Sequence, residues 1–465
     1  MSVVQKTLRN PAASMPATRQ PDAGSAPPTL GRNSRMKRLA GRLNLFQRTM
    51  LDWRELHPYI AVHAARIAEP LDTVAARRAI DETLEHAGLT GLELDRRRGR
   101  YEWHGGPSAS ALEVIDAGVD WATTLAAVFE RQLNAPFTDD GRIDPFRFFA
   151  IDQGDAFFLG IAYDHFVAGG DSIVVLLNAI ADRYAGLPAP VAPLSRYPHT
   201  HRRLFARHPL RFVRGLARMP AMVSSCRRTI RPRYRTLADG HNAFTFFTLE
   251  PAEYATLRTA ARGWGVTLND ALIALLLLAQ DAQMPDRDRA KRRHELAVAS
   301  IMNLRDAHRE DTRATFGQFL SSFRVSHPVP PGITLGELAQ DVNRATTRVK
   351  REKLYLTTLG AIAVDRIAGR FRTRDQKLGV YAKSYPVGAG VSSLNVNALW
   401  ESATNSGAPP YIRGVPTGPA SPVVVAVTTS GNTLCAGITY RTAAAGPDDI
   451  LDLQAHIKSR IRALK

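Results

Sequence analysis

The segment that spans residues 147–184 constrains the fold more than any other part of this chain. Residues 147–151 and 156–163 are two apolar, aromatic-rich runs, and the Asp-Gln-Gly-Asp sequence at 152–155 separates them, which predicts a β-hairpin. Residues 173–184 then follow the apolar periodicity of a buried helix. A hairpin that leads directly into a buried helix requires a sheet covered by helices, so the sequence predicts a mixed α/β fold.

The connection between this hairpin and its helix carries the residues best suited to chemistry. His165 ends the second strand, Gly169 and Gly170 follow, and Asp171 or Ser172 is predicted to cap the helix. An imidazole has an ordinary pKa close to working pH, so His165 can accept a proton from an alcohol or an amine. The glycines permit close backbone approach, and the helix start offers N–H groups to a developing oxyanion. The local pattern therefore predicts a general base at His165, with a purely structural histidine as the alternative.

Strands and helices are mixed in both halves of the chain, which predicts two α/β domains. In the first half, residues 57–63 alternate like a strand; in the second, 267–270 have the form of a capping box ahead of an apolar helix. The predicted organisation is a disordered basic tail at 1–36, an N-terminal domain with the histidine at 37–185, an Arg/Pro-rich connector at 186–240, and a C-terminal domain at 241–465.

The chain is strongly basic, with 61 Lys and Arg against 43 Asp and Glu and a net charge of +18. Much of this charge lies in the connector, where residues 201–235 hold eleven arginines and no acidic residue. This stretch is either a solvated basic helix between the two halves or a surface for an anionic lipid or an acidic carrier protein. Nucleic-acid binding would need interleaved aromatic residues, and only Phe205, Phe212 and Tyr234 are present, so nucleic acid is not a predicted partner.

Several common kinds of site are missing from the sequence. The only two cysteines, Cys226 and Cys435, are far apart, and His294-Glu295 lacks the second histidine of a zinc protease. No phosphate-binding loop and no Gly-x-Ser-x-Gly turn occur. The longest apolar run, 271–279, is too short to span a membrane, and the first 36 residues lack the apolar core of a secretory signal. We therefore predict a cytoplasmic protein with no metal and no bound cofactor.

A family resemblance appears around the histidine. Residues 163–172, Tyr-Asp-His-Phe-Val-Ala-Gly-Gly-Asp-Ser, resemble the HHxxxDGxS motif of the acyltransferase superfamily. This superfamily includes chloramphenicol acetyltransferase, the condensation domains of nonribosomal peptide synthetases, plant BAHD acyltransferases and wax ester synthases. His165 matches the second, catalytic histidine of the motif, Gly170 its glycine and Ser172 its serine. Asp164 stands where the motif has its first histidine, and Gly169 stands where it has its aspartate.

Further segments resemble the same superfamily in the same order along the chain. They are Glu69–Asp72 before a helix, the Thr-Leu-Asn-Asp start at Thr267–Asp270, the strand Ser300–Arg305, the segment Phe316–Arg324, which is similar to the Gly-x-Phe-x-Asn segment of condensation domains, and Gly390–Asn395. Each match is short. Together they extend the resemblance over about residues 43–465, because their order agrees with the family.

The resemblance implies an α/β fold of two chloramphenicol-acetyltransferase-like domains, which form a pseudo-dimer with a central tunnel. It implies acyl transfer from acyl-CoA or a phosphopantetheinyl thioester to a hydroxyl or amine, in lipid or in polyketide or nonribosomal peptide biosynthesis. His165 would be the base. The motif loop Gly169–Ser172 would hold the oxyanion with backbone N–H groups, aided by Ser393, and the supporting residues would be Asn303, Arg305 and Asn395. The expected partners are an acyl or peptidyl carrier protein, a small-molecule or lipid acceptor, and an anionic membrane contacted peripherally.

The glycine at position 169 leaves a second hypothesis open. In the family, the motif aspartate holds the histidine loop through an arginine. Since Gly169 lacks that carboxylate, the chain is alternatively a non-catalytic, condensation-like module that binds a carrier protein or an acyl chain. Asp171, two residues later, is the candidate replacement, with Arg305 as its predicted partner.

Overall fold

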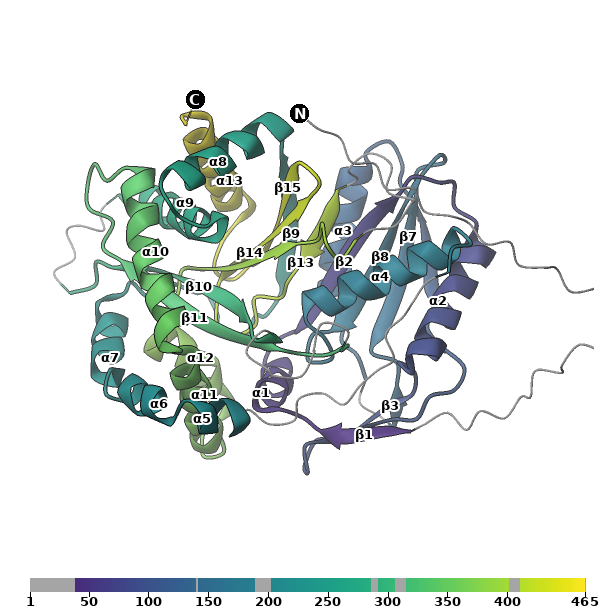
Figure 1. Ribbon diagram of the computed structural model, residues 1–465, viewed down its shortest axis with the longest axis horizontal. Coiled ribbons are helices and arrows are strands. Elements are labelled where there is room, and N and C mark those ends of the chain that lie inside the picture. Colours follow the sequence, from purple (N-terminus) through teal and green to yellow (C-terminus); the bar gives the residue numbers. More distant parts are fainter. Residues whose placement is uncertain are drawn as a thin grey trace, which may run out of the picture. The chain divides into compact units, whose positions relative to one another are not determined.

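The computed structural model describes residues 38–138, 141–188, 202–285, 292–305, 315–400 and 410–464. The predicted disordered tail at 1–36 and residues 189–201 of the predicted connector lie outside these ranges. Two larger sheets organise the described chain, one built mainly from each half of the sequence (Figure 1).

The first large sheet contains the predicted hairpin. Its strands lie in the order β13-β2-β8-β7-β5, with β13 at Tyr411–Gly414, β2 at Ile60–Ile67, β8 at Phe157–Asp164, β7 at Phe146–Asp152 and β5 at Leu112–Asp116. The hairpin of β7 and β8 is confirmed, with Phe149 opposite Gly160. The ring of Phe149 occupies the space that a side chain at 160 would need, so glycine is required there.

Helices cover both faces of this sheet (Figure 1). Two of them, α2 (Thr73–Ala87) and α4 (Gly170–Tyr184), pack against each other over one face, and α3 (Trp121–Asn134) packs on the other. A small sheet, β1-β4-β3-β6, lies beside them; its strands are β1 Leu39–Arg42, β4 Arg100–Trp103, β3 Leu92–Asp95 and β6 Arg142–Ile143. The helix α1 (Leu45–Arg54) follows β1 and contributes to the same core.

The second large sheet has six strands in the order β11-β10-β12-β14-β15-β9. They are β11 Leu320–His327, β10 Leu296–Asn303, β12 Ala389–Asn395, β14 Val423–Ser430, β15 Thr433–Arg441 and β9 Asn242–Leu249. Four helices pack on it: α8 Pro251–Gly263, α9 Leu268–Ala282, α10 Leu335–Glu352 and α13 Pro447–Arg462. The capping box of Thr267 and Asp270 is confirmed, and it starts the fully buried stretch of α9.

One strand of the second half completes the sheet of the first. β13 pairs antiparallel with β2, so that Arg413 lies opposite His63. Its backbone also passes close to β15, where the carbonyl of Arg413 occupies the space that a side chain at 437 would need, and residue 437 is a glycine. This strand therefore adds side chains of the second half to the edge of the first sheet, beside β2.

The described part of the basic connector forms three short helices. One of the two alternatives predicted for this stretch was a solvated basic helix between the two halves. They are α5 (Arg202–Arg207), α6 (Pro209–Leu216) and α7 (Met219–Arg228). The prediction of one basic helix is wrong because the stretch is interrupted twice, with Pro209 as the first residue of α6 and Pro220 as the second residue of α7. The last helices are α11 (Tyr355–Gly369), on which α6 packs, and α12 (Arg374–Ser384), which contacts α7.

Within the described residues, no single helix is both long enough and apolar enough to cross a membrane. Only α8 and α9 taken together reach that length and composition, and they are bent by 104° relative to each other.

Candidate active site

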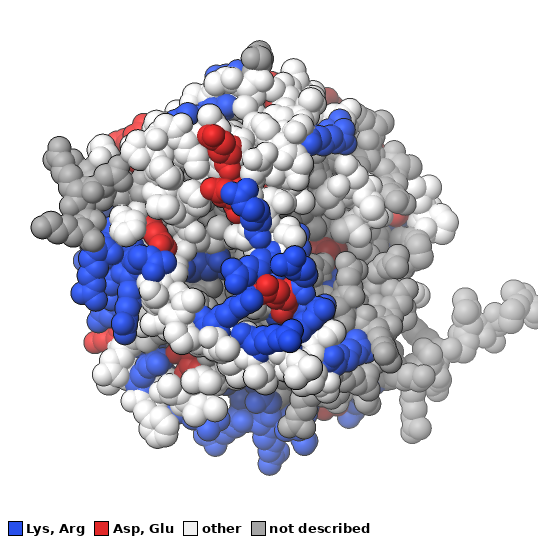
Figure 2. All heavy atoms as spheres, turned by 60° about the vertical axis from the view of Figure 1, so that its left-hand side comes forward, with Lys and Arg blue, Asp and Glu red and all other residues white. Residues whose placement is uncertain are grey.

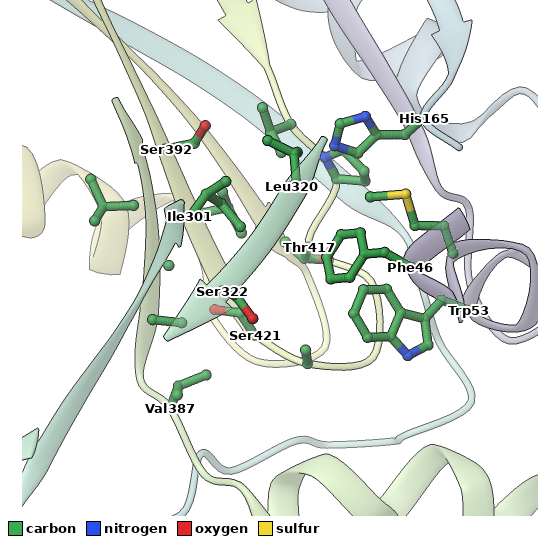
Figure 3. A pocket seen from close by; sticks show the side chains of 18 of the residues that line it. Phe46, Trp53, His165, Ile301, Leu320, Ser322, Val387, Ser392, Thr417 and Ser421 are labelled. Carbon is green, nitrogen blue, oxygen red and sulfur yellow. The ribbon is translucent and has the colours of Figure 1, made fainter. Parts of the chain in front are cut away.

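A cavity of about 390 Å³ is lined by residues of both large sheets and of the helices beside them. Its lining is mostly apolar, which suits an organic ligand with a small number of polar contacts. His165 lies at one end and Val387 at the other, with Ile301, Leu320 and Ser322 between them (Figure 3). The aromatic rings of Phe46 and Trp53, both from α1, line the same side as His165.

His165 enters the cavity from the end of the buried strand β8. Its side chain is only 6% exposed, and its ring stacks on Tyr59 at a centroid distance of 5.6 Å. Tyr163 meets the ring edge-on at 5.8 Å. The two tyrosines therefore fix the plane of the imidazole, because rotation would bring the ring into one of them.

The His165 imidazole is neutral at physiological pH. Burial lowers its pKa to about 4, because the charged form loses its hydration. The interaction with the Ala168 backbone raises the pKa, and the positive charge of Arg413 lowers it further. Its Nδ1 is buried and has no hydrogen-bond partner among the described residues. A neutral imidazole has one unprotonated nitrogen, which is the form that accepts a proton.

Gln318 holds the backbone of the histidine loop. Its Nε2 donates to the carbonyl of His165 at 2.8 Å and to that of Ala168 at 3.1 Å. The N–H of Gly169 donates to the carbonyl of Gly317 at 2.9 Å. The loop that carries the candidate base is therefore fixed by a segment from the second half of the chain. The Gly169 N–H is already used in this contact, so of the two predicted oxyanion donors only that of Gly170 lies at the cavity wall.

Asp171 does not cap α4. The N-cap is Gly169, without a side-chain cap, so the predicted capping by Asp171 or Ser172 is wrong. The Asp171 carboxylate instead forms an ion pair with Arg305 and accepts a hydrogen bond from Asn303 Nδ2 at 3.1 Å. Its Oδ1 accepts from the N–H of Ser172 at 2.9 Å, so the carboxylate bonds one N–H group of the helix start from inside the first turn and not from the N-cap position.

The predicted partner of Asp171 is thus the one observed. Arg305 also donates from Nη2 to Ser172 Oγ at 2.6 Å and stacks on Phe319 at 4.2 Å. A side chain at 169 would place its Cβ 2.9 Å from Asp171 Oδ1, so the Asp171 carboxylate fills the space beside Gly169. The carboxylate that is missing at 169 is therefore supplied at the same place from residue 171.

The remaining predicted residues divide into two groups. Gly170, Asn303 and Ser393 line the cavity together with His165 and Asp171. Ser172 and Arg305 lie behind this wall, where Ser172 Oγ also accepts from the Gly317 N–H at 3.1 Å. Asn395 is not part of the lining: its side chain accepts from the N–H of Asn397 at 3.0 Å and stabilises the turn after β12.

Two residues of the cavity wall were not predicted as site residues. His63 on β2 is hydrogen-bonded through Nδ1 to the Tyr411 hydroxyl at 3.0 Å and lies 3.4 Å from the Tyr163 hydroxyl through Nε2. Arg413 on β13 is 2% exposed and also lines the cavity. Burial lowers the pKa of His63 well below its usual range, and the charge of Arg413 acts in the same direction.

The next features are the possible metal ligands and the two cysteines of the described residues. These residues contain no group of three or more His, Cys, Asp and Glu side chains placed to hold a metal ion. Cys226 and Cys435 are both buried, and burial raises the pKa of the Cys435 thiol to about 12.

No protein-family model matches this chain, and no curated protein is detectably similar to it. Solved structures do match it over almost their full length. The first condensation domain of the CDA synthetase has a TM-score of 0.65 at 17% identity, covering 92% of this chain and 96% of that one. The starter condensation domain of rhizomide synthetase, a mutant in complex with C8-CoA, has a TM-score of 0.64 at 13% identity, covering 91% and 94%.

Two further solved structures match over a similar share of the chain. The SgcC5 protein from Streptomyces globisporus has a TM-score of 0.61 at 14% identity, covering 91% of this chain and 98% of that one. The epimerization domain from the third module of tyrocidine synthetase B has a TM-score of 0.61 at 13% identity, covering 92% and 97%. The chain therefore has the fold of condensation domains. This confirms the predicted class, α/β with two chloramphenicol-acetyltransferase-like lobes.

Proposed function

We propose that this chain is an acyltransferase that moves an acyl group from a thioester to a hydroxyl or amine acceptor, with His165 as general base. The observation that carries the proposal is the position of His165: a neutral imidazole, fixed between Tyr59 and Tyr163, at the wall of a mostly apolar cavity. Acyl transfer needs such a base beside a dry channel for the acyl group.

In the proposed reaction, the unprotonated nitrogen of His165 takes the proton of the acceptor as the acceptor oxygen or nitrogen attacks the thioester carbonyl. The tetrahedral oxyanion is stabilised by the N–H of Gly170 at the start of α4. Ser393, the second donor implied by the resemblance, lies on the same cavity wall, but its hydroxyl donates to Asn269 Oδ1 at 2.9 Å. The C–S bond then breaks, and the thiolate leaves with the proton that His165 had accepted.

The apolar part of the cavity is the proposed place for the acyl chain. Leu320, Ile301 and Val387 follow one another along its wall, starting from the end where His165 lies (Figure 3). Burying each methylene of an acyl chain against such a wall contributes about 0.8 kcal/mol. An acyl chain whose end points toward Val387 would have its thioester carbonyl near His165.

The donor is proposed to be acyl-CoA or a phosphopantetheinyl thioester on an acyl or peptidyl carrier protein. The rhizomide synthetase neighbour was solved with C8-CoA. On this chain, the face that contains the connector helices gathers Lys and Arg side chains (Figure 2). Arg211 and Arg214 of α6 are exposed, and Met222 of the adjoining α7 reaches the cavity. Phosphate groups or an acidic carrier protein are the ligands that such a face attracts.

The same basic face fits an anionic membrane that presents a lipid acceptor. Leu210 and Val213 are exposed between the arginines of α6, as in helices that bind lipid surfaces. We place the reaction in secondary-metabolite biosynthesis, of polyketide or nonribosomal peptide type. The structural neighbours include the first condensation domain of the CDA synthetase and the condensation domain from the Monacolin K polyketide synthase MokA.

The alternative function, a condensation-like module that binds without reacting, depended on the missing carboxylate at Gly169. The ion pair between Asp171 and Arg305 supports the catalytic proposal, since it supplies a carboxylate to the histidine loop. A binding module would need no neutral imidazole at the cavity.

The test is incubation of the purified chain with a panel of acyl-CoA and acyl-carrier donors and of amine and alcohol acceptors, with mass spectrometry of the products. We expect acyl transfer that His165→Ala lowers at least about 100-fold, since general-base catalysis contributes that much or more. His86→Ala, on the exposed side of α2, is the matched control and should keep wild-type turnover. Unchanged turnover in His165→Ala would contradict the mechanism, and absence of transfer with every donor would favour the binding module.

A further inference from the structure

Arg413 is a buried cation without a carboxylate partner in the described chain. Its Nε donates to Thr428 Oγ1 at 2.8 Å, and its Nη2 donates to the carbonyls of Ser392 and Val427, each at 2.7 Å. All three acceptors are neutral. Burial lowers the pKa of Arg413 to about 10, which leaves the guanidinium protonated at physiological pH. A buried charge that no counter-charge neutralises lowers the stability of the fold, so we asked what ligand Arg413 could bind.

The unused part of this guanidinium lies at the cavity. Arg413 lines the cavity, and its Nη1 donates to no acceptor in the described residues. A Cβ at Gly170 would lie 3.4 Å from Nη1 and 3.4 Å from His63 Cε1. The absence of a side chain at 170 therefore keeps the space beside Nη1 open, between the start of α4 and the strands β2 and β13.

Among the other titratable groups around this space, the Asp171 carboxylate is paired with Arg305, whereas His63, Tyr163 and Tyr411 are neutral. Burial holds the pKa of His63 well below its usual range and that of Tyr411 well above its own, and it raises the pKa of Tyr163. Arg413 thus contributes one positive charge that no carboxylate of the described chain neutralises, whereas the Asp171 carboxylate in the same wall is already paired with Arg305. A single positive charge with two free N–H groups matches one carboxylate, whereas a phosphate dianion would leave an uncompensated negative charge.

We propose that Arg413 binds the carboxylate of the acceptor substrate, and that this acceptor is an amino acid or hydroxy acid whose amine or hydroxyl faces His165. The inference rests on the proposed acyl transfer, because it assigns an acceptor to that reaction. Arg413 is then a specificity-determining residue: an acceptor without a free carboxylate leaves the guanidinium buried and unpaired. The three hydrogen bonds to Thr428, Ser392 and Val427 hold the guanidinium in place and leave Nη1 for the ligand.

The test measures binding without any donor, so that it does not depend on turnover. Calorimetric titration compares L-leucine, L-phenylalanine and 3-hydroxydecanoate, each with its own carboxamide. We expect at least one acid to bind the wild-type chain about 10-fold or more tightly than its amide, the usual gain of a charge-assisted pair. Arg413→Met should abolish this preference while the affinity for the amide changes little, and Arg413→Lys should keep part of it.

The matched control is Arg441→Met. Arg441 is as buried as Arg413 but lies outside the cavity lining, where it stacks on Tyr234 and donates to the carbonyls of Leu237 and Asp239. It should keep the preference for the acid. His165→Ala should also keep the preference although it loses transfer, which separates this inference from the catalytic one.

Two results would overturn the proposal: no acid in the panel binds the wild-type chain more tightly than its amide, or the preference survives in Arg413→Met. If Arg413→Met does not fold, competition on the wild-type chain decides. Acetate should weaken binding of the preferred acid and leave binding of its amide unchanged, and an equal effect of acetate on both would refute the assignment.

Discussion

The Asp171 carboxylate and the Arg305 guanidinium form an ion pair that joins the first turn of α4 to the chain that follows β10. Both side chains are largely buried, and Arg305 also holds Ser172 Oγ at 2.6 Å. The pair therefore connects the helix that follows the candidate base to the second half of the chain. Its position beside Gly169 explains how this chain keeps a carboxylate at the histidine loop without the motif aspartate.

Asp171→Ala should destabilise the fold and slow transfer. The substitution removes the charged acceptor of hydrogen bonds from Arg305 and Asn303, which should cost about 2 kcal/mol of unfolding free energy. We expect a fall in turnover of about 10-fold or more, because the loop of His165 loses an anchor. Urea unfolding and single-turnover kinetics measure the two effects. Asp81→Ala is the control: it breaks the exposed ion pair with Arg77 and should cost less than about 1 kcal/mol. Equal losses in both variants would contradict the assigned role.

Moving the carboxylate back to residue 169 should rescue this defect. In Gly169→Asp alone, the new side chain starts 2.9 Å from Asp171 Oδ1, so two carboxylates compete for one site and stability should fall. In the double variant Gly169→Asp, Asp171→Ala, a single carboxylate again faces Arg305, and both stability and turnover should exceed those of Asp171→Ala. A double variant no better than Asp171→Ala would show that position 169 cannot replace position 171.

The pH profile of transfer should reflect the environment of His165. Only the unprotonated imidazole accepts a proton, and burial and Arg413 lower its pKa to about 4. With a hydroxyl acceptor, which does not titrate in this range, the value of kcat/KM should therefore rise as the pH increases through about 4 and stay level between about pH 6 and 8. An unperturbed histidine would produce the rise near 6.5 instead. Initial rates across this range, with circular dichroism to exclude acid unfolding, measure the profile. An inflection near 6.5 would show that the base is exposed or is another residue.

The sequence was sufficient for the local features of this site. Apolar periodicity and turn residues correctly predicted the hairpin, the buried helix after it and the position of His165 at the end of the second strand. All three depend on residues that are adjacent in the sequence. The predicted capping by Asp171 or Ser172 was wrong because α4 starts earlier than predicted, at Gly170, which places Asp171 inside the first turn, where it pairs with Arg305. The residues around Asp171 do not show that Arg305, more than 130 positions later, lies beside it.

His63 and Arg413 could not be found in the same way. Arg413 belongs to a strand of four residues that pairs with β2, almost 350 positions earlier in the chain. A strand this short has no periodicity of its own. His63 ends a stretch of alternating residues that was correctly predicted to be extended, but nothing in that alternation shows that a buried arginine lies opposite it. Both residues became site residues through pairing across the two halves.

A buried histidine away from the cavity should make the fold acid-sensitive. Burial lowers the pKa of His57 to about 3, and neither ring nitrogen has a hydrogen-bond partner in the described chain. As the pH falls below 6.5, the unfolded chain binds a proton at His57 and the folded chain does not, so stability decreases. At about pH 5 this histidine alone costs up to about 2 kcal/mol.

His57→Leu should therefore lose less stability between about pH 7 and pH 5 than the wild-type chain does. Urea unfolding at the two pH values provides the comparison, which is independent of any change in stability that the substitution causes at pH 7. His86→Leu, at an exposed position of α2, should leave the pH dependence unchanged. The same pH dependence in His57→Leu and wild type would show that His57 is accessible to protons in the folded state.

The end of the cavity opposite His165 should set the length of the acyl chain. Val387 is buried there, beyond Ile301 and Leu320 as seen from His165 (Figure 3). Val387→Phe adds a ring at the point where a long chain would terminate, and the steric cost falls only on chains that reach it. We expect kcat/KM for dodecanoyl-CoA to fall about 10-fold or more and that for acetyl-CoA to change less than about 2-fold. Val364→Phe, at a position of α11 that is 67% exposed, is the control and should leave the length profile unchanged. If folded Val387→Phe slows short and long donors equally, the acyl chain does not extend toward Val387, and its path must lie along another wall of the cavity.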